Sequence, residues 1–464
     1  MVTRADIQIA LEEATHLGAD FAEIYLEDKD ELTIHYDASS VQGIAKAHHY
    51  GAGLYLIAGT NSTYVYTNHV CREELLKLAR IGNDMLRAKS AGICIPLSAC
   101  VSRGDNPCPV LTFPSAVSNL EKIRVLENSY KAAMSASPYI RGISLAYFDV
   151  DQRVSVFNSE GLWVEDHRVT TRLRRSPKLQ SGSRQLGYFS DFTRSCGFEA
   201  FADEGYIASI VGTVKDMEET LFADDAPVGL MPVIFEAGDS SGTFFHEACG
   251  HALETSTMEV QPTFRDRLKT RIASEKVTLI DDGTLPHQYG SSAFDDEGML
   301  RQKNILIKDG VLESYLVDRL GSIRFNIPRT GSGRRQGYAF APCARMSNTY
   351  LAPGSDDDDE MIRSLPEGLL VTQIGGGVES GGFSLAAQKA YLIRNGQIDR
   401  PVRGAIVSGK CEESMRLIDR VGKKLVYEDD GAFCGAGSGL VNTTTSGARM
   451  RVSEMMVGGT GGAE

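Results

Sequence analysis

The 464-residue sequence predicts an α+β protein with a mixed α/β N-terminal domain and a β-rich C-terminal domain. Three observations lead to this prediction. Segments of helical periodicity alternate with short runs of β-branched and aromatic residues over the first half of the chain. Beyond residue 226, glycine becomes dense and the strand pattern dominates. One segment of that second half, 242–256, keeps a helical pattern and contains two histidines.

The helices and strands expected in the first half follow from these patterns. Residues 4–17 repeat apolar positions at helical spacing, and Thr3 precedes them as a predicted N-cap. Further helices are expected at 72–88, 116–135 and 204–222, and strands at 21–26, 32–36, 51–57, 63–66, 143–149 and 154–157. Asp151 and Gln152 are interpreted as the turn of a hairpin. Trp163, the only tryptophan, is placed in the next strand with its ring in the core.

A domain boundary is predicted where the last of these helices ends. Two acids at 224–225 are followed by Ala226 and Pro227, and such a sequence cannot continue a helix. The predicted domains are therefore an N-terminal α/β domain, 1–225, and a C-terminal β-rich domain, 226–464.

Composition limits the partners and the location that the protein is expected to have. The formal net charge of −13 disfavours nucleic acid and acidic membrane surfaces as partners, because both would repel the chain. The nine cysteines include no C-x-x-C pair, and the first residues lack the apolar segment of a signal peptide. No run approaches the ~20 apolar residues that a membrane span needs. We therefore expect a cytoplasmic protein with free thiols.

The strongest chemical signal is the string FFHEACGHALE at 244–254, in which His246, Glu247 and His251 form the pattern H-E-x-x-x-H. Two imidazoles can bind a metal, and a neighbouring carboxylate can accept a proton from the attacking water. Together they are the components of a zinc hydrolase. The competing interpretation is an ordinary helix whose histidines point in different directions.

The spacing of the two histidines makes a local structural prediction. Histidines five residues apart differ by about 140° around a regular α-helix and could not share a metal. One extra residue in the turn, a π-bulge, would return both side chains to one face. Gly250 makes that distortion easier because it has no side chain to clash. We therefore predict a widened or broken helix between His246 and His251.

A catalytic zinc site needs a third protein ligand, which the residues alone leave open. The candidates are Cys434, Cys343, Cys249, His287 and Glu254. Cys434 lies in a glycine-rich stretch where the backbone can approach a metal closely, although most cysteines are simply small buried residues. Glu254 follows His251 by three residues on the same helix face. Glu254 is therefore better suited to accept a hydrogen bond from the His251 imidazole than to bind the metal itself.

These residues belong to a wider resemblance. The string HEACGHALE is similar to the H-E-A-x-G-H-x-L-E motif of the TldD/PmbA metallopeptidase family. The chain resembles a TldD-type member over essentially its whole length. Further similar blocks lie at 281–286, 295–298, 333–335 with Tyr338, 345–350, 375–382 and 390–393.

The resemblance implies a mostly antiparallel C-terminal domain that holds zinc between His246, His251 and Cys434, with Glu247 as catalytic base. It implies that the substrate is an unstructured peptide or unfolded protein, threaded as an added strand into an enclosed channel. It also implies either a homodimer or a heterodimer with a TldE/PmbA-like subunit that lacks the metal motif. Cys249 departs from the family, where a small apolar residue is expected.

The hypothesis from the sequence is therefore metal-assisted amide hydrolysis, with Tyr338, Arg345 and His287 as candidate donors to the oxyanion. Two alternatives stay open. In the first, the chain serves as a non-catalytic peptide-binding or modulator subunit, although such a protein has no need of Glu247. Alternatively, it is a thiol hydrolase that uses Cys434 or Cys249 with His246, which metal removal would not inactivate.

Overall fold

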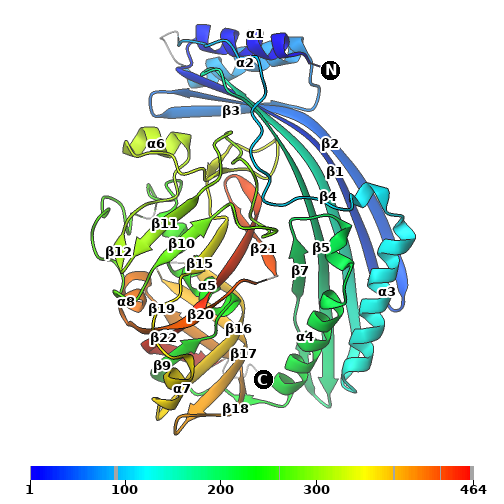
Figure 1. Ribbon diagram of the computed structural model, residues 1–464, viewed down its shortest axis with the longest axis vertical. Coiled ribbons are helices and arrows are strands. Elements are labelled where there is room, and N and C mark those ends of the chain that lie inside the picture. Colours follow the sequence, from blue (N-terminus) through cyan, green and yellow to red (C-terminus); the bar gives the residue numbers. More distant parts are fainter. Residues whose placement is uncertain (1, 88–91, 261, 380–381, 429, 460–464) are drawn as a thin grey trace.

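The computed structural model describes residues 2–87, 92–260, 262–379, 382–428 and 430–459. Within these residues, two large sheets are built from successive parts of the chain (Figure 1). The first is antiparallel, with strand order β3-β2-β1-β4-β5-β6, and β7 also pairs with β5. Its strands are β1 (Phe21–Asp37), β2 (Ser40–Ala58), β3 (Asn61–Thr67), β4 (Ile140–Asn158), β5 (Trp163–Ser181), β6 (Arg184–Gly187) and β7 (Ser190–Arg194).

Four helices of the first part lie where the periodicity predicts them. They are α1 (Arg4–His16), α2 (Arg72–Leu86), α3 (Asn119–Ala136) and α4 (Gly205–Leu221). The Thr3 hydroxyl accepts a hydrogen bond from the Asp6 amide, which confirms the expected N-cap of α1. In Figure 1, α1 and α2 lie at one end of the long sheet and α3 and α4 towards the other.

The predicted hairpin at Asp151 and Gln152 is wrong, because β4 runs straight through both residues. Their side chains have partners on the neighbouring strands. Nε2 of His167 lies 2.7 Å from a carboxylate oxygen of Asp151, and the Gln152 amide donates to Glu27 at 2.7 Å. The two strands expected at 21–26 and 32–36 are likewise a single strand, β1. Trp163 begins β5 and packs, partly buried, against the core beneath α1 and α2.

The alternation of side chains along β1 determines what each face of the first sheet contacts. Its even-numbered apolar residues, such as Ile24 and Ile34, pack under the four helices. The odd-numbered residues Glu23, Tyr25 and Glu27 point the other way, towards the C-terminal part of the chain. The two parts are therefore joined across a largely polar face.

The second sheet is mostly antiparallel, as expected, and the α+β fold class is confirmed. Its parallel pairs are β15–β22, β9–β16 and β8–β18. Its strands are β8 (Asp224–Asp225), β9 (Gly229–Phe235), β10 (Leu279–Asp282), β11 (Lys303–Lys308), β12 (Val311–Leu312), β15 (Asn348–Leu351), β16 (Glu367–Glu379), β17 (Phe383–Arg394), β18 (Gln397–Arg403), β19 (Ala405–Gly409), β20 (Ile418–Val426), β21 (Gly431–Ala436) and β22 (Gly439–Gly459). A separate pair is formed by β13 (Gly333–Arg334) and β14 (Cys343–Ala344), and the short helices are α5 (Asp239–Phe245), α6 (Arg319–Phe325), α7 (Asp358–Arg363) and α8 (Cys411–Arg416).

The predicted division at 225/226 falls at the end of β8, whose partner β18 belongs to the second sheet. The division into two domains itself stays a prediction. In the part of the chain that the structure describes, no helix is both long enough and apolar enough to cross a membrane.

Helix α5 is held inside the second part, against β22, β15 and β16. Gly242 permits this position, because a Cβ atom there would lie 2.3 Å from the backbone nitrogen of Ser446. Phe244 anchors the helix in the core, with its ring centroid 5.0 Å from that of Phe235 and 5.2 Å from that of Phe383. The histidine motif therefore follows directly from a rigidly packed helix.

Candidate metal centre

The structure brings together His246, His251 and Cys434, whose donor atoms all lie within 4.8 Å of one another. Nε2 of His246 lies 3.1 Å from Sγ of Cys434, and Nε2 of His251 lies 3.4 Å from the same sulfur. In a tetrahedral zinc site, Zn–S and Zn–N bond lengths place sulfur and nitrogen about 3.5 Å apart. The spacing and the chemistry of these three donors fit a zinc ion.

The backbone between the two histidines has the distortion that their spacing predicts. Helix α5 ends at Phe245, residues His246–Gly250 form a π-helical turn, η3, and His251–Leu253 form a 3₁₀ turn, η4. The wider turn brings the imidazole rings to one side, with centroids 4.9 Å apart. The prediction of a widened helix is confirmed, and the interpretation as an ordinary helix is excluded.

Gly250 has a specific packing reason to lack a side chain. Its backbone angles, φ −55° and ψ −51°, are ordinary helical values. A Cβ atom at this position would lie 2.2 Å from Sδ of Met346. The clash that glycine avoids is therefore with Met346, which packs directly beneath the π-helical turn.

We expect Gly250→Ala to destabilise the protein by about 1–3 kcal/mol, because the added methyl group overpacks the site against Met346. Urea unfolding measures this change. In a Met346→Ala background the same substitution should cost much less. Gly212→Ala in α4 is the matched control, since a Cβ there meets no atom within 4 Å. Equal losses in both backgrounds would show that Met346 is not the cause.

Electrostatics in the cluster favour a cation between the donors. Burial opposes ionisation of the Cys434 thiol, but the charges and hydrogen bonds of His246 and His251 outweigh it and lower the pKa of the thiol to about 5. Burial likewise opposes protonation of His251, yet the hydrogen bonds and charges of Cys434 and Glu254 raise its pKa to about 11. The Cys434 thiolate is thus stabilised by positive charge located between it and the two imidazoles.

Glu254 lies where the sequence places it, behind His251. One of its carboxylate oxygens is 3.4 Å from Nδ1 of His251, and the other accepts from the Met346 amide at 3.1 Å and Nε of Arg345 at 3.4 Å. The carboxylate has no exposed surface. Its contact with Nδ1 leaves Nε2 of His251 directed at the cluster, as in carboxylate–histidine–zinc arrangements.

Glu254→Gln should lower the affinity for zinc by about 10- to 100-fold, because the amide no longer holds the imidazole with a charged acceptor. Titration against a chromophoric zinc chelator gives the dissociation constant. Glu259→Gln is a suitable control, since Glu259 is half-exposed and pairs with Arg324 outside the cluster. An unchanged affinity in Glu254→Gln would remove this residue from the proposed site.

Glu247 projects from the π-helical turn towards β16. Its Cγ would lie 2.9 Å from a Cβ atom at Gly377, so this glycine leaves the room that the side chain occupies. Within the described residues, its carboxylate makes no hydrogen bond or ion pair. The side chain is partly exposed. A carboxylate with no protein partner beside a metal site is free to accept a proton.

The remaining candidates for the third ligand lie outside the cluster. Cys249 is fully buried in the apolar core, and Cys343 is not among the grouped donors. His287 lies beside Ser195, with Nδ1 3.3 Å from that residue's carbonyl oxygen.

Of the candidate oxyanion donors, only Arg345 lies at the cluster. It has no exposed surface, and the charges of Glu254 and Cys434 oppose the effect of burial and raise its pKa. Tyr338 instead packs against Gly51 of the first sheet. Arg345 therefore contacts Glu254 and interacts with Cys434.

Asp239 is a functional candidate that the sequence analysis missed. Burial raises its pKa, while hydrogen bonds from Thr445 and Thr243 and the charge of His246 act in the opposite direction. Nδ1 of His246 is buried with no hydrogen-bond partner among the described residues. Asp239 thus supplies negative charge near His246. Its position seven residues before His246, two turns earlier, is the signal that could have identified it.

Comparison with known sequences agrees with the motif. Models of the three PmbA/TldA metallopeptidase domains match residues 22–91 (domain 1), 113–221 (central domain) and 228–459 (C-terminal domain). A metalloprotease TldD homolog of Haemophilus influenzae is 28% identical, over 96% of this chain and 94% of its own length. A zinc metalloprotease TldD homolog of Saccharolobus solfataricus is 27% identical, over 73% of this chain and 76% of its own.

Solved structures share the fold at low sequence identity. A Thermotoga maritima protein described as a modulator of a DNA gyrase superposes with a TM-score of 0.78 at 16% identity, covering 98% of this chain and 99% of its own. TldE from Thermococcus kodakarensis superposes with a TM-score of 0.72 at 17% identity, covering 98% of this chain and all of its own. These likenesses extend over the whole fold.

Proposed function

The chain belongs to the PmbA/TldD metallopeptidase family, and from this premise we propose that it is a zinc peptidase that hydrolyses unstructured peptides. One observation supports the proposal above all others. Two imidazoles and a thiolate, from segments more than 180 residues apart, converge beside the unpaired carboxylate of Glu247. A purely structural zinc site would have no use for that carboxylate. Relatives of the chain are named metalloproteases.

The chain's own residues take distinct parts in this reaction. His246, His251 and Cys434 would hold the zinc, and Glu254 would fix the orientation of His251 through Nδ1. Zinc at this position supplies a Lewis acid that makes water more acidic and polarises the peptide carbonyl. The Glu247 carboxylate accepts the proton of the attacking water and delivers it to the leaving amine.

An extended peptide is the substrate that the surroundings of Cys434 favour. Within the described residues β21 pairs only with β22, so one edge of the strand that contains Cys434 has unpaired backbone groups. A peptide that adds to such an edge is held by main-chain hydrogen bonds, which accept almost any sequence. The polar space between the first sheet and the C-terminal part would form the enclosing channel.

We further propose a division into domains 1–225 and 226–464. We also propose a cytoplasmic location, where cysteines remain as thiols. The partner would be a second copy of the chain or a TldE/PmbA-like subunit. The likeness of the whole fold to that of TldE supports the pairing with a TldE/PmbA-like subunit.

The alternative function is that of a non-catalytic modulator subunit, because structural neighbours are called modulators of DNA gyrase.

Metal removal tests the proposal. Treatment with 1,10-phenanthroline should abolish cleavage of an unstructured fluorogenic peptide, and about one equivalent of zinc should restore it. A metal-free protein that still cleaves would be a thiol hydrolase acting through Cys434. A zinc-loaded protein that never cleaves, alone or with a TldE-like subunit, would be the modulator.

A further inference from the structure

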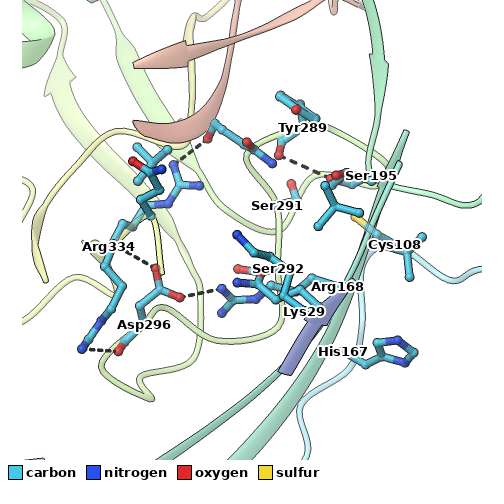
Figure 2. Close-up of a pocket in the computed structure, with 18 of the residues that line it drawn as sticks. Lys29, Cys108, His167, Arg168, Ser195, Tyr289, Ser291, Ser292, Asp296 and Arg334 are labelled. Carbon is cyan, nitrogen blue, oxygen red and sulfur yellow. Dashed lines mark hydrogen bonds and ion pairs between the residues drawn. The ribbon is translucent and has the colours of Figure 1, made fainter. Parts of the chain in front are cut away.

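A cavity of about 220 Å³ lies between the first sheet and the β21–β22 hairpin, which carries Cys434 (Figure 2). Its walls come from β1, β4, β5 and the segments 289–296, 334–336 and 440–442. Phe433, the residue before Cys434, and Val441, the cross-strand partner of Cys434, also line it. Typical ligand pockets are larger, about 300–1,000 Å³. The space suits one side chain or the end of a peptide.

Most of the charges in this cavity neutralise one another. Lys29 lies 2.9 Å from Glu31, and Arg335 lies 2.5 Å from Glu23. Arg168 bridges Asp166 and Asp296 with N–O distances of 2.8 and 2.5 Å. Each of these cations already faces a carboxylate, and the pairs of Arg168 with Asp296 and of Arg335 with Glu23 join the two parts of the chain.

Arg334 is the exception. Its Nη1 donates to the carbonyl oxygens of Met346 and Asn442, both at 2.7 Å, which fixes the guanidinium in place. Among the described residues, no hydrogen bond uses its Nε or Nη2, and no carboxylate lies within ion-pair distance. Burial, together with the charge of Arg301, lowers the pKa of Arg334 to about 9.

The position of Arg334 places this charge in the wall of the cavity. Figure 2 shows Arg334 and Asp296 on one side of the cavity and Ser195 and Tyr289 on the other. Asn442, which Arg334 holds, is the cross-strand partner of Phe433. A peptide end that enters this cavity would therefore meet the guanidinium of Arg334.

We propose that Arg334 binds a carboxylate of the peptide substrate in this cavity. The guanidinium fork matches a carboxylate with two parallel hydrogen bonds, and its anchored Nη1 leaves the other nitrogens free to make them. The carboxylate belongs either to the peptide's C-terminus or to one of its acidic side chains. The proposal rests on the proposed peptidase function and defines the substrate class.

Binding to a zinc-loaded Glu247→Gln protein tests this without turnover. Three labelled peptides of otherwise identical sequence are compared by fluorescence anisotropy: one with a free C-terminus, one amidated, and one amidated with an internal Gln replaced by Glu. We expect the free acid or the Glu peptide to bind at least about 10-fold more tightly than the uncharged one. The first result assigns the C-terminus and the second an acidic side chain.

Substitution of the arginine then locates the effect. Arg334→Met should abolish the preference, and Arg334→Lys should retain only part of it, because a point charge lacks the fork. Arg184→Met should retain it fully, since Arg184 also donates to a backbone carbonyl, that of Leu221, but lies outside the cavity. Zinc content and affinity for the amidated peptide report whether each variant is folded.

If the zinc-loaded Glu247→Gln protein, with Arg334 intact, binds all three peptides equally, the inference is overturned. This holds whatever the Arg334 variants show. Cleavage by the wild type is measured alongside. Cleavage without any carboxylate preference rejects only the role of Arg334. A zinc-loaded wild type that binds the acid preferentially but never cleaves rejects the peptidase function and leaves the cavity assignment standing.

Discussion

Glu247→Gln is expected to lower the rate of peptide hydrolysis by at least about 100-fold while zinc stays bound. General bases typically contribute 10²- to 10⁴-fold to a rate, and glutamine cannot accept the proton. The substitution is nearly isosteric, and the carboxylate has no partner among the described residues, so little structure depends on it. Steady-state kinetics on a fluorogenic unstructured peptide and elemental analysis on the same preparation give both quantities.

The matched control for this variant is Glu367→Gln, an exposed glutamate on β16, the strand against which Glu247 packs. It should leave both rate and zinc content unchanged. Loss of zinc from Glu247→Gln would identify Glu247 as a ligand. Full activity in that variant would exclude it as the base.

Cys434→Ala should lower the affinity for zinc by at least about 100-fold and remove hydrolysis with it. The substitution deletes one of three protein donors, and even residues that only orient a ligand contribute about 10- to 100-fold. It leaves His246 and His251 facing each other with no anionic partner between them. Competition with a chromophoric chelator measures the affinity.

Cys249→Ala provides the comparison, because Cys249 adjoins the histidines in sequence but is buried in the apolar core. It should keep its zinc, although its stability should fall with the lost packing. If Cys434→Ala kept zinc and Cys249→Ala lost it, the assignment of the third ligand would be reversed.

Much of the fold was predictable because its signals are local. The helical periodicity of 4–17 and the capping residue Thr3 are both visible in a few residues of sequence. The π-helical turn was predictable for a different reason. Two histidines five apart can meet at one metal only if the helix widens, so their chemistry constrains the backbone.

The errors arose where distant residues decide the structure. Asp151 and Gln152 looked like a turn because polar pairs in strands are uncommon, but His167 and Glu27 on neighbouring strands satisfy them. The third donor stayed open among five residues for the same reason. Cys434 reaches the histidines through the pairing of β21 with β22, a register that no local pattern specifies.

The measurement that tests the central claim most directly is zinc K-edge X-ray absorption of the purified wild type. We expect about one zinc per chain, with one sulfur at about 2.3 Å and two imidazole nitrogens at about 2.0–2.1 Å in its first shell. The sulfur shell should be absent from any zinc bound by Cys434→Ala. A wild-type spectrum without sulfur, or one with two sulfurs, would contradict a centre formed by His246, His251 and Cys434.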